Sequence, residues 1–349
     1  ISVLCMVLGL FALVVLTDLI ENLRFAGQVA GGDFGLAMSL TLLRAPAVTQ
    51  LTLPFVFLFA SVWTFNQLNR RSEISVMRSA GLSIWRLISP GALVAAIAGL
   101  VIILALDPLS TRLMAMAEET KARQFGGERN LVEIFADGIW LQQREPTMHL
   151  IMRADRFDQA GAALEDVTLW RFDDEHIFLE RIDATKAFLS GRTMELHDAR
   201  LKSVGEKTQR ESPIYAIGTS LSPEDLGERA APPETLSLWK LPRFIELAET
   251  AGLSTLRYDM RFHELISTPL KLVAMVLIAA AFSLRPQRQG GMLGFIVLSV
   301  GAGFALYILV EVSTALGLSG ASPASLAAWT PAVVATIAAI TALLHLEDG

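Results

Sequence analysis

The residues best suited to chemistry lie in one short segment between two apolar runs. Four arginines, Arg70, Arg71, Arg78 and Arg86, surround a single acid, Glu73. Polar residues recur every three or four positions in this segment and apolar residues fall between them, which predicts an amphipathic helix. Glu73 can pair with an arginine of a partner, and Arg78 can pair with an acid. We expect this segment to dock another protein.

Gly81 and Ser83 are candidates for a helix end and for the start of the next helix. A glycine ends or bends a helix because it adopts left-handed backbone angles readily, and a serine hydroxyl can cap the next helix. A second interpretation stays open, in which the segment is an amphipathic helix lying on a lipid surface. The candidate docking residues are Arg70, Arg71, Glu73, Arg78, Gly81 and Ser83.

No catalytic motif accompanies this segment. The sequence has no Gly-x-x-x-x-Gly-Lys-Ser/Thr loop for phosphates, no Gly-x-Ser-x-Gly nucleophile elbow and no His-Glu-x-x-His metal motif. Cys5 is the only cysteine, so neither an internal disulfide nor a cysteine metal site is possible. We therefore expect a non-catalytic chain with no cofactor or metal of its own. Any ATP hydrolysis that drives it must come from another polypeptide.

Charged residues within or beside apolar runs are candidates for contacts with a substrate. Lys271 lies inside such a run, where a charged side chain costs about 2.5–3.5 kcal/mol on insertion scales. Its amine would contact an anionic substrate or snorkel to the headgroups. Glu311 lies at the end of another run. It would be either a proton-coupling acid or a solvated acid at a helix end. Asp18, Glu21 and Arg24 lie on one side of the helix at the end of the first run. They would either line the rim of a vestibule or simply be solvated at the end of the helix.

The best candidate for a titrating pair is His263 and Glu264. With Lys271 and Glu311, these two residues would serve an ion-coupled carrier. The alternative is a polar pair at a membrane interface, which carries no proton or ion.

The composition indicates a membrane protein. Hydrophobic residues make up 52% of the 349 residues and charged residues 18%, below the roughly 25% of a typical soluble domain. Six apolar runs are close to the roughly 20 residues that cross a bilayer as a helix. These runs are residues 1–17, 51–69, 87–106, 265–284, 292–312 and 323–344.

Basic residues in short loops mark the cytoplasmic side of a membrane protein. The segment around Glu73 and the loop with Arg285 and Arg288 both fit this rule. Residues 21–50 then form an external connection between the first two spans. The predicted organisation is a first transmembrane half over 1–106, an external domain over 107–261 and a second transmembrane half over 262–349.

The external domain begins with a helical pattern over 110–123 and then alternates as strands do. Alternation without intervening helices favours an antiparallel sandwich or jelly roll. A further helix is expected over 237–251, with Ser237 as its N-cap. The predicted strands are 139–143, 148–153, 167–173, 177–189 and 193–201.

Residues 71–83 resemble the coupling-helix motif of the LptF/LptG permeases, the membrane subunits of the lipopolysaccharide export ABC transporter. The family pattern is an acid, an arginine five residues later and then Ala-Gly-x-Ser. This chain has Glu73, Arg78, Ala80-Gly81 and Ser83 at those places.

The resemblance extends over nearly the whole chain. It includes Leu53-Pro54-Phe55, Pro269 and Trp329-x-Pro331. The chain departs from the family where a Trp-x-Leu-x-Asp strand is expected, since it has Met194-Glu195-Leu196-His197-Asp198 there. Between the two paralogues of the family, Trp329-x-Pro331 and the closing 347–349 favour LptG.

The resemblance implies a six-span permease with an inserted antiparallel β-jellyroll in the periplasm, in the inner membrane of a Gram-negative bacterium. It implies a cytoplasmic LptB-like ATPase dimer that holds ATP and Mg, an LptF-like paralogous permease and a single-span, LptC-like bridge protein. Lipopolysaccharide would be extracted from the outer leaflet of the inner membrane and passed to that bridge. The docking residues would contact the ATPase, and Arg24, Lys271 and Glu311 would face the substrate cavity.

Two other functions remain as alternatives. One is a permease of another ABC-type system that extracts lipids or lipoproteins. The other is the ion-coupled carrier described above, which would work without an ATPase.

Overall fold

The computed structural model describes most of the chain. The described residues are 2–27, 33–124, 131–135, 138–145, 148–158, 163–173, 177–190, 193–205, 208–219, 232–284 and 292–348.

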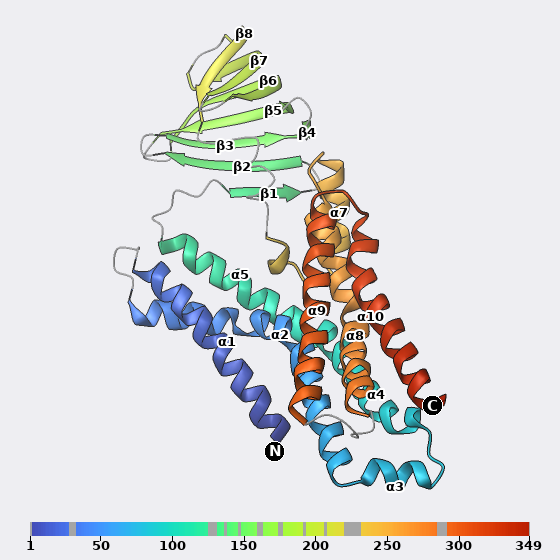
Figure 1. The fold of residues 1–349 in the computed structure, drawn as a ribbon. Helices are drawn as coiled ribbons and strands as arrows, with labels where there is room; N and C mark the ends of the chain where they lie inside the picture. Colours follow the sequence, from blue (N-terminus) through green and yellow to red (C-terminus); the bar gives the residue numbers. More distant parts are fainter. Residues whose placement is uncertain are drawn as a thin grey trace. The chain divides into compact units, whose positions relative to one another are not determined.

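The chain divides into two compact units. A helical unit contains Ile1–Ala117 and Asp259–Gly349, and a sheet unit contains Glu118–Tyr258. The sheet unit is therefore inserted between two groups of helices, as Figure 1 shows for the order of the elements along the chain.

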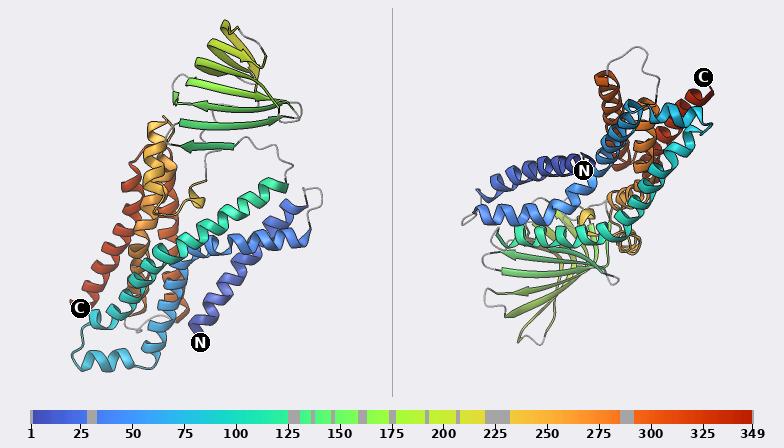
Figure 2. Two further views of the ribbon diagram at one scale, coloured as in Figure 1. Left: turned by 180° about the vertical axis from the view of Figure 1, so that it is seen from behind. Right: turned by 90° about the horizontal axis from the view of Figure 1, so that it is seen from below.

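The helical unit consists of long helices joined by short connections (Figures 1 and 2). Five helices among the described residues are long and apolar enough to cross a membrane: Phe34–Arg70, Ile84–Lys121, Leu256–Ser283, Leu298–Leu318 and Ala324–Glu347. The remaining predicted span, residues 1–17, falls in α1, and the structure does not describe many of the side chains there. The helices are α1 (Ser2–Ala26), α2 (Phe34–Arg70), α3 (Glu73–Ser79), α4 (Ile84–Val101), the π-helical η1 (Ile102–Leu106), α5 (Asp107–Gln124), the short 3-10 turn η2 (Pro233–Thr235), α7 (Leu241–Thr250), α8 (Leu256–Ser283), α9 (Met292–Leu318) and α10 (Ala324–Asp348).

Most of residues 21–50, which are predicted to lie outside the membrane, are helical. The helix α1 continues to Ala26, and α2 already begins at Phe34. The side chain of Asp33 caps α2 by accepting a hydrogen bond of 2.8 Å from the Leu36 N–H. Polar residues show where a helix leaves the apolar part of the membrane, but the helix can continue beyond them. The hydropathy pattern alone therefore did not show that α1 and α2 extend into residues 21–50.

Small residues allow the long helices to approach closely. A Cβ at Gly99 of α4 would lie 2.4 Å from the Cα of Pro269 in α8, and one at Gly303 of α9 would lie 2.2 Å from the Leu58 side chain of α2. Such close approach is typical of helices that pack inside membranes. These contacts hold α2, α4, α8 and α9 around one apolar core, which includes Leu58, Ile88, Leu272, Ala279 and Leu343.

The sheet unit is an eight-stranded antiparallel sheet, which agrees with the predicted fold class. Seven strands follow the order β1-β2-β3-β5-β6-β7-β8, and β4 pairs with β5. The strands are β1 (Leu131–Phe135), β2 (Gly138–Glu145), β3 (Met148–Ala154), β4 (Arg156–Asp158), β5 (Ala163–Phe172), β6 (Phe178–Ser190), β7 (Thr193–Ser203) and β8 (Arg210–Gly218).

One face of the sheet forms the core of this unit. Alternate residues of successive strands are buried together, among them Leu141, Met152, Leu169, Ile182 and Leu196. A polar contact also lies among the buried residues, a 2.9 Å hydrogen bond from the Thr219 hydroxyl to the Gln143 side-chain oxygen. This bond joins the end of β8 to β2, although these strands are far apart in the order of the sheet.

The five predicted strands are confirmed with small shifts in their ends, whereas β1, β4 and β8 were not predicted. β7 departs from the family pattern but keeps its inward-facing apolar positions, because Met194 and Leu196 are both buried. Asp198 then adopts a left-handed conformation with φ of 53°. This irregularity shifts the register so that Ala199 is buried as well.

The helix expected over 237–251 begins later than predicted. Its N-cap is Lys240 and not Ser237, which instead accepts backbone hydrogen bonds from the Lys240 and Leu241 N–H groups in the preceding turn. The helix predicted over 110–123 lies within α5.

Candidate functional site

The candidate docking segment, residues 70–83, connects α2 to α4 through the short helix α3 (Figure 1). Arg70 is the last residue of α2 and Arg71 is its C-cap. Ser72 then turns the chain with a left-handed φ of 56°, and α3 starts at Glu73. The charged residues of the predicted motif are therefore grouped at a sharp corner between two long helices.

The helix α3 has one anchored face and one free face. Ile74 is 5% exposed and belongs to the apolar core of the helical unit, against which Met77 also packs. On the other side, Val76 is 65% exposed, and Arg78 and Ser79 are exposed as well. The helix is therefore packed against the long helices on one face and exposed on the other.

The charges of α3 are only weakly engaged within the chain. Arg71 Nη1 lies 3.9 Å from Glu73 Oε1, and both side chains are well exposed. An exposed pair at that distance contributes about 0–1 kcal/mol, so a better-placed partner arginine can replace Arg71. Arg78 forms no ion pair within the described residues. Both charges are therefore available to a second protein.

The end of α3 confirms the predicted roles of Gly81 and Ser83. Gly81 has a φ of 82°, a left-handed conformation that favours glycine. Ser83 Oγ accepts a 3.1 Å hydrogen bond from the Trp85 N–H and so caps α4. The expected amphipathic helix is thus split in two, because the glycine turn separates α3 from the first turn of α4.

A small groove of about 230 Å³ runs along this turn. It is lined by Ile74, Met77, Arg78, Leu82, Ser83, Ile84, Arg86, Leu87 and Pro90. The groove therefore combines apolar side chains with the Arg78 and Arg86 guanidinium groups.

The three candidate substrate residues lie on three different helices. Arg24 is exposed in the last turn of α1, and Lys271 is half-buried in α8. Glu311 is exposed in α9 and accepts a hydrogen bond from the Tyr307 hydroxyl one turn before it. No hydrogen bond or ion pair joins these three residues within the described part of the chain, so the structure of the single chain does not assemble them into one site.

Two polar contacts that the sequence did not reveal lie at the ends of the spans. Asp107, at the start of α5, is fully buried and accepts a 3.1 Å hydrogen bond from Arg261 Nη2 of α8. Near it, Glu264 accepts a 2.9 Å hydrogen bond from the Thr314 hydroxyl of α9. These contacts join α5, α8 and α9, and the second engages the carboxylate that was expected to pair with His263.

A second buried polar cluster joins α1 to α2. Arg44 Nη1 lies 3.2 Å from Asp18 Oδ1. The Asn22 side-chain amide donates to Asp18 at 2.8 Å and to the Thr41 hydroxyl at 3.0 Å. Glu21 lies only at the edge of the cluster, 4.0 Å from Arg44. Asp18 therefore serves helix packing rather than the rim of a vestibule.

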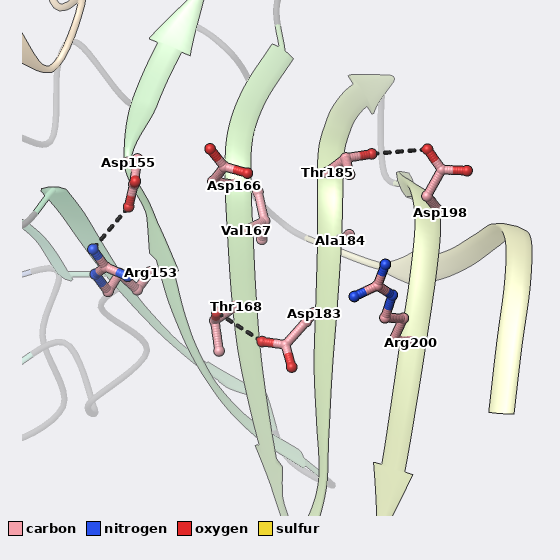
Figure 3. A pocket seen from close by; sticks show the side chains of 10 residues that line it. All are labelled: Arg153, Asp155, Asp166, Val167, Thr168, Asp183, Ala184, Thr185, Asp198 and Arg200. Carbon is pink, nitrogen blue, oxygen red and sulfur yellow. Dashed lines mark hydrogen bonds and ion pairs between the residues drawn. The ribbon is translucent and has the colours of Figure 1, made fainter. Parts of the chain in front are cut away.

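The sheet unit carries a polar pocket of about 270 Å³ across β3, β5, β6 and β7 (Figure 3). Its carboxylates are largely engaged, as in the pairs Arg153–Asp155 and Thr185–Asp198. No group of three or more His, Cys, Asp or Glu side chains among the described residues is placed to hold a metal ion. We assign no chemistry to this pocket.

These features define a class of protein: a helical membrane protein with one inserted antiparallel sheet domain and a charged corner helix between two of its spans. Residues 1–345 match the family described as "Lipopolysaccharide export system permease LptF/LptG". The chain belongs to this family, and the predicted family is thus confirmed.

Individual relatives agree with the family assignment. The chain is similar to the lipopolysaccharide export system permease protein LptG of Escherichia coli strain K12, with 24% identity over 332 residues, which cover 92% of this chain and 89% of the relative. It is also similar to the LptG protein of Haemophilus influenzae, with 23% identity over 348 residues, which cover 93% and 90%. The similarity therefore extends over both units.

Proposed function

We propose that this chain is the LptG-type permease subunit of a lipopolysaccharide exporter and that an LptB-like ATPase dimer docks on residues 70–83. Membership of the permease family supports the transport role, and the names of the relatives support the LptG branch. One observation carries the docking proposal: α3 is anchored through Ile74 and leaves Glu73, Val76 and Arg78 accessible. In this proposal ATP and Mg belong to the partner, and the permease performs no chemistry.

The mechanism follows from how α3 is connected. The turn at Gly81 and the cap at Ser83 couple α3 directly to α4, while Arg70 and Arg71 couple it to α2. Asn69 Nδ2 donates a 3.2 Å hydrogen bond to the Ser283 carbonyl oxygen, which ties the same corner to the end of α8. A displacement of α3 by the ATPases would therefore move α2, α4 and α8 together.

The substrate cavity would form only with a second, LptF-like permease. Arg24, Lys271 and Glu311 are unconnected in the single chain, which supports a cavity completed by residues of a paralogue. In this proposal Arg24 and Lys271 bind the phosphates of lipopolysaccharide, and Glu311 repels them from one wall. The sheet unit would lie in the periplasm and pass the lipid to an LptC-like bridge protein.

The docking proposal is tested by reversing the charge at Glu73. We expect Glu73→Lys to abolish co-purification of the ATPase, because the new lysine would repel the partner's arginine. Glu195→Lys, a charge reversal at an exposed residue of β7, is the control and should leave co-purification unchanged. Binding of Glu73→Lys at the wild-type level would reject the docking site while leaving the family assignment intact.

A further inference from the structure

The Glu264 carboxylate of α8 interacts with two groups at once. It accepts a 2.9 Å hydrogen bond from the Thr314 hydroxyl of α9. Its charge also attracts the Lys271 amine, which belongs to the same helix. Glu264 therefore connects α9 to the candidate substrate residue Lys271. The transport function proposed above leaves this acid without a role.

The periodicity of α8 places Glu264 and Lys271 on one side of the helix. Seven residues make almost two turns, so the two positions differ by about 20° around the axis and by about 10 Å along it. Helical side chains lean toward the N-terminus of their helix, which favours the approach of the long Lys271 side chain to Glu264. Between them, the Ser267 and Thr268 hydroxyls donate to the Glu264 carbonyl oxygen at 3.0 Å and remain engaged within α8.

Glu264 is the acid that balances the charge of Lys271 in the described part of the chain. Another acid of the helical unit, Asp107, accepts a hydrogen bond from Arg261 and is neutralised by it. Arg261 itself repels the Lys271 amine. Lys271 forms no close ion pair within the described residues, so its amine is attracted to Glu264 but is not fixed by it.

A lysine inside a span needs a negative partner, because an isolated charge is strongly unfavourable in hydrocarbon. Glu264 supplies that partner while no substrate is bound. A phosphate that approaches Lys271 brings a second negative charge to the same amine. Two negative charges repel each other strongly where little water screens them, so the phosphate and Glu264 oppose each other at Lys271.

We propose that Glu264 competes with a phosphate of the transported lipid for Lys271. The inference rests on the proposed function, in which Lys271 binds a phosphate of lipopolysaccharide. The competition weakens the binding of each substrate molecule and so favours its release. It also selects for charge, because a zwitterionic phospholipid, whose phosphate is balanced by its own amine, displaces Glu264 less readily than a lipid with uncompensated phosphates.

The test is the affinity of the purified transporter complex in detergent for fluorescently labelled lipopolysaccharide, measured without ATP. Glu264→Gln removes the charge and retains an oxygen that can accept from Thr314. We expect its Kd to fall about fivefold, because one repulsive charge beside the phosphate is lost. A purely structural role of Glu264 predicts weaker or unchanged binding, and either result would overturn the proposal.

Thr314→Val is the matched control for the helix contact. It removes the hydrogen bond between α8 and α9 and leaves the charge of Glu264 in place. We expect the Kd of this variant to equal that of the wild type. A fall in Kd as large as in Glu264→Gln would show that the broken helix contact, and not the lost charge, strengthens binding, and the competition would be rejected.

Lys271→Gln separates this inference from the function on which it rests. We expect Lys271→Gln to bind lipopolysaccharide more weakly, and the double variant with Glu264→Gln to bind no more tightly than Lys271→Gln alone. Wild-type binding by Lys271→Gln would refute the role of Lys271 itself and the competition with it. Weaker binding by Lys271→Gln without a gain in Glu264→Gln would refute only the competition.

Discussion

Asp107 and Arg261 are 154 positions apart in the chain and form an ion pair of 3.1 Å at the ends of two long helices. Asp107 is completely buried, and Arg261 is largely buried beside it. A carboxylate in such a place needs a positive partner, because transfer of an isolated charge out of water is strongly unfavourable. This pair fixes the start of α5 against α8.

Removal of the partner arginine should destabilise the helical unit. We expect Arg261→Met to lower the free energy of unfolding by about 3 kcal/mol, since it leaves Asp107 buried without its counter-ion. The measurement is the thermal unfolding midpoint of the purified protein in detergent. Arg257→Met, an exposed arginine one turn earlier on α8, is the control and should unfold within error of the wild type.

The contact of Gly99 with Pro269 leads to a second prediction. Gly99→Ala should destabilise the protein by about 1–3 kcal/mol, because the new methyl group meets the backbone of α8 and cannot be relieved by a side-chain rotation. Gly301→Ala, where nothing lies within 4 Å of the added Cβ, is the matched control. If both variants unfold at the same temperature, α4 and α8 do not pack as described.

The cluster between α1 and α2 should behave as one coupled unit. We expect a double-mutant cycle of Asp18→Asn and Arg44→Met to give a coupling free energy of about 1–3 kcal/mol, measured by chemical unfolding. Glu21→Gln combined with Arg44→Met should give almost none, because Glu21 is exposed and 4.0 Å away. Equal coupling in the two cycles would argue against a buried pair.

The cap of α4 can be tested locally. Ser83→Ala removes the hydroxyl that accepts from the Trp85 N–H and should destabilise the first turn of α4 by about 1 kcal/mol. Hydrogen exchange of the Trp85 and Arg86 amides should then become roughly fivefold faster, which corresponds to that free energy. Ser89→Ala, in the same helix, should leave these amides unchanged.

The sequence predicted the features that depend on local patterns. Alternating hydrophobicity located five strands, and the order of Glu73, Arg78, Gly81 and Ser83 located the corner helix and its end. These predictions succeeded because the burial of alternate residues and the preference of glycine for left-handed angles act over only a few positions.

Features that depend on distant partners were missed. The strand β8 contains Pro213 and begins with the charged pair Arg210 and Glu211, so its strand character comes from pairing with β7 and not from its own pattern. Arg44 was not recognised as a partner of Asp18, because it lies outside the predicted spans and 26 positions from Asp18 in the chain. Arg24, Lys271 and Glu311 were chosen one by one, and in the single chain they lie on three separate helices.

The π-helical turn at residues 102–106 affects the direction in which the residues of the following helix, α5, face. A π turn accommodates about one residue more than an α turn, and one residue corresponds to about 100° of rotation around a helix axis. Asp107 comes directly after this turn, and the same residues wound as a regular α-helix would turn it away from α8. A deletion of a single residue between Ile102 and Leu106 would instead convert the π turn into an α turn and leave Asp107 facing Arg261, because the π turn takes up one extra residue within the same rotation.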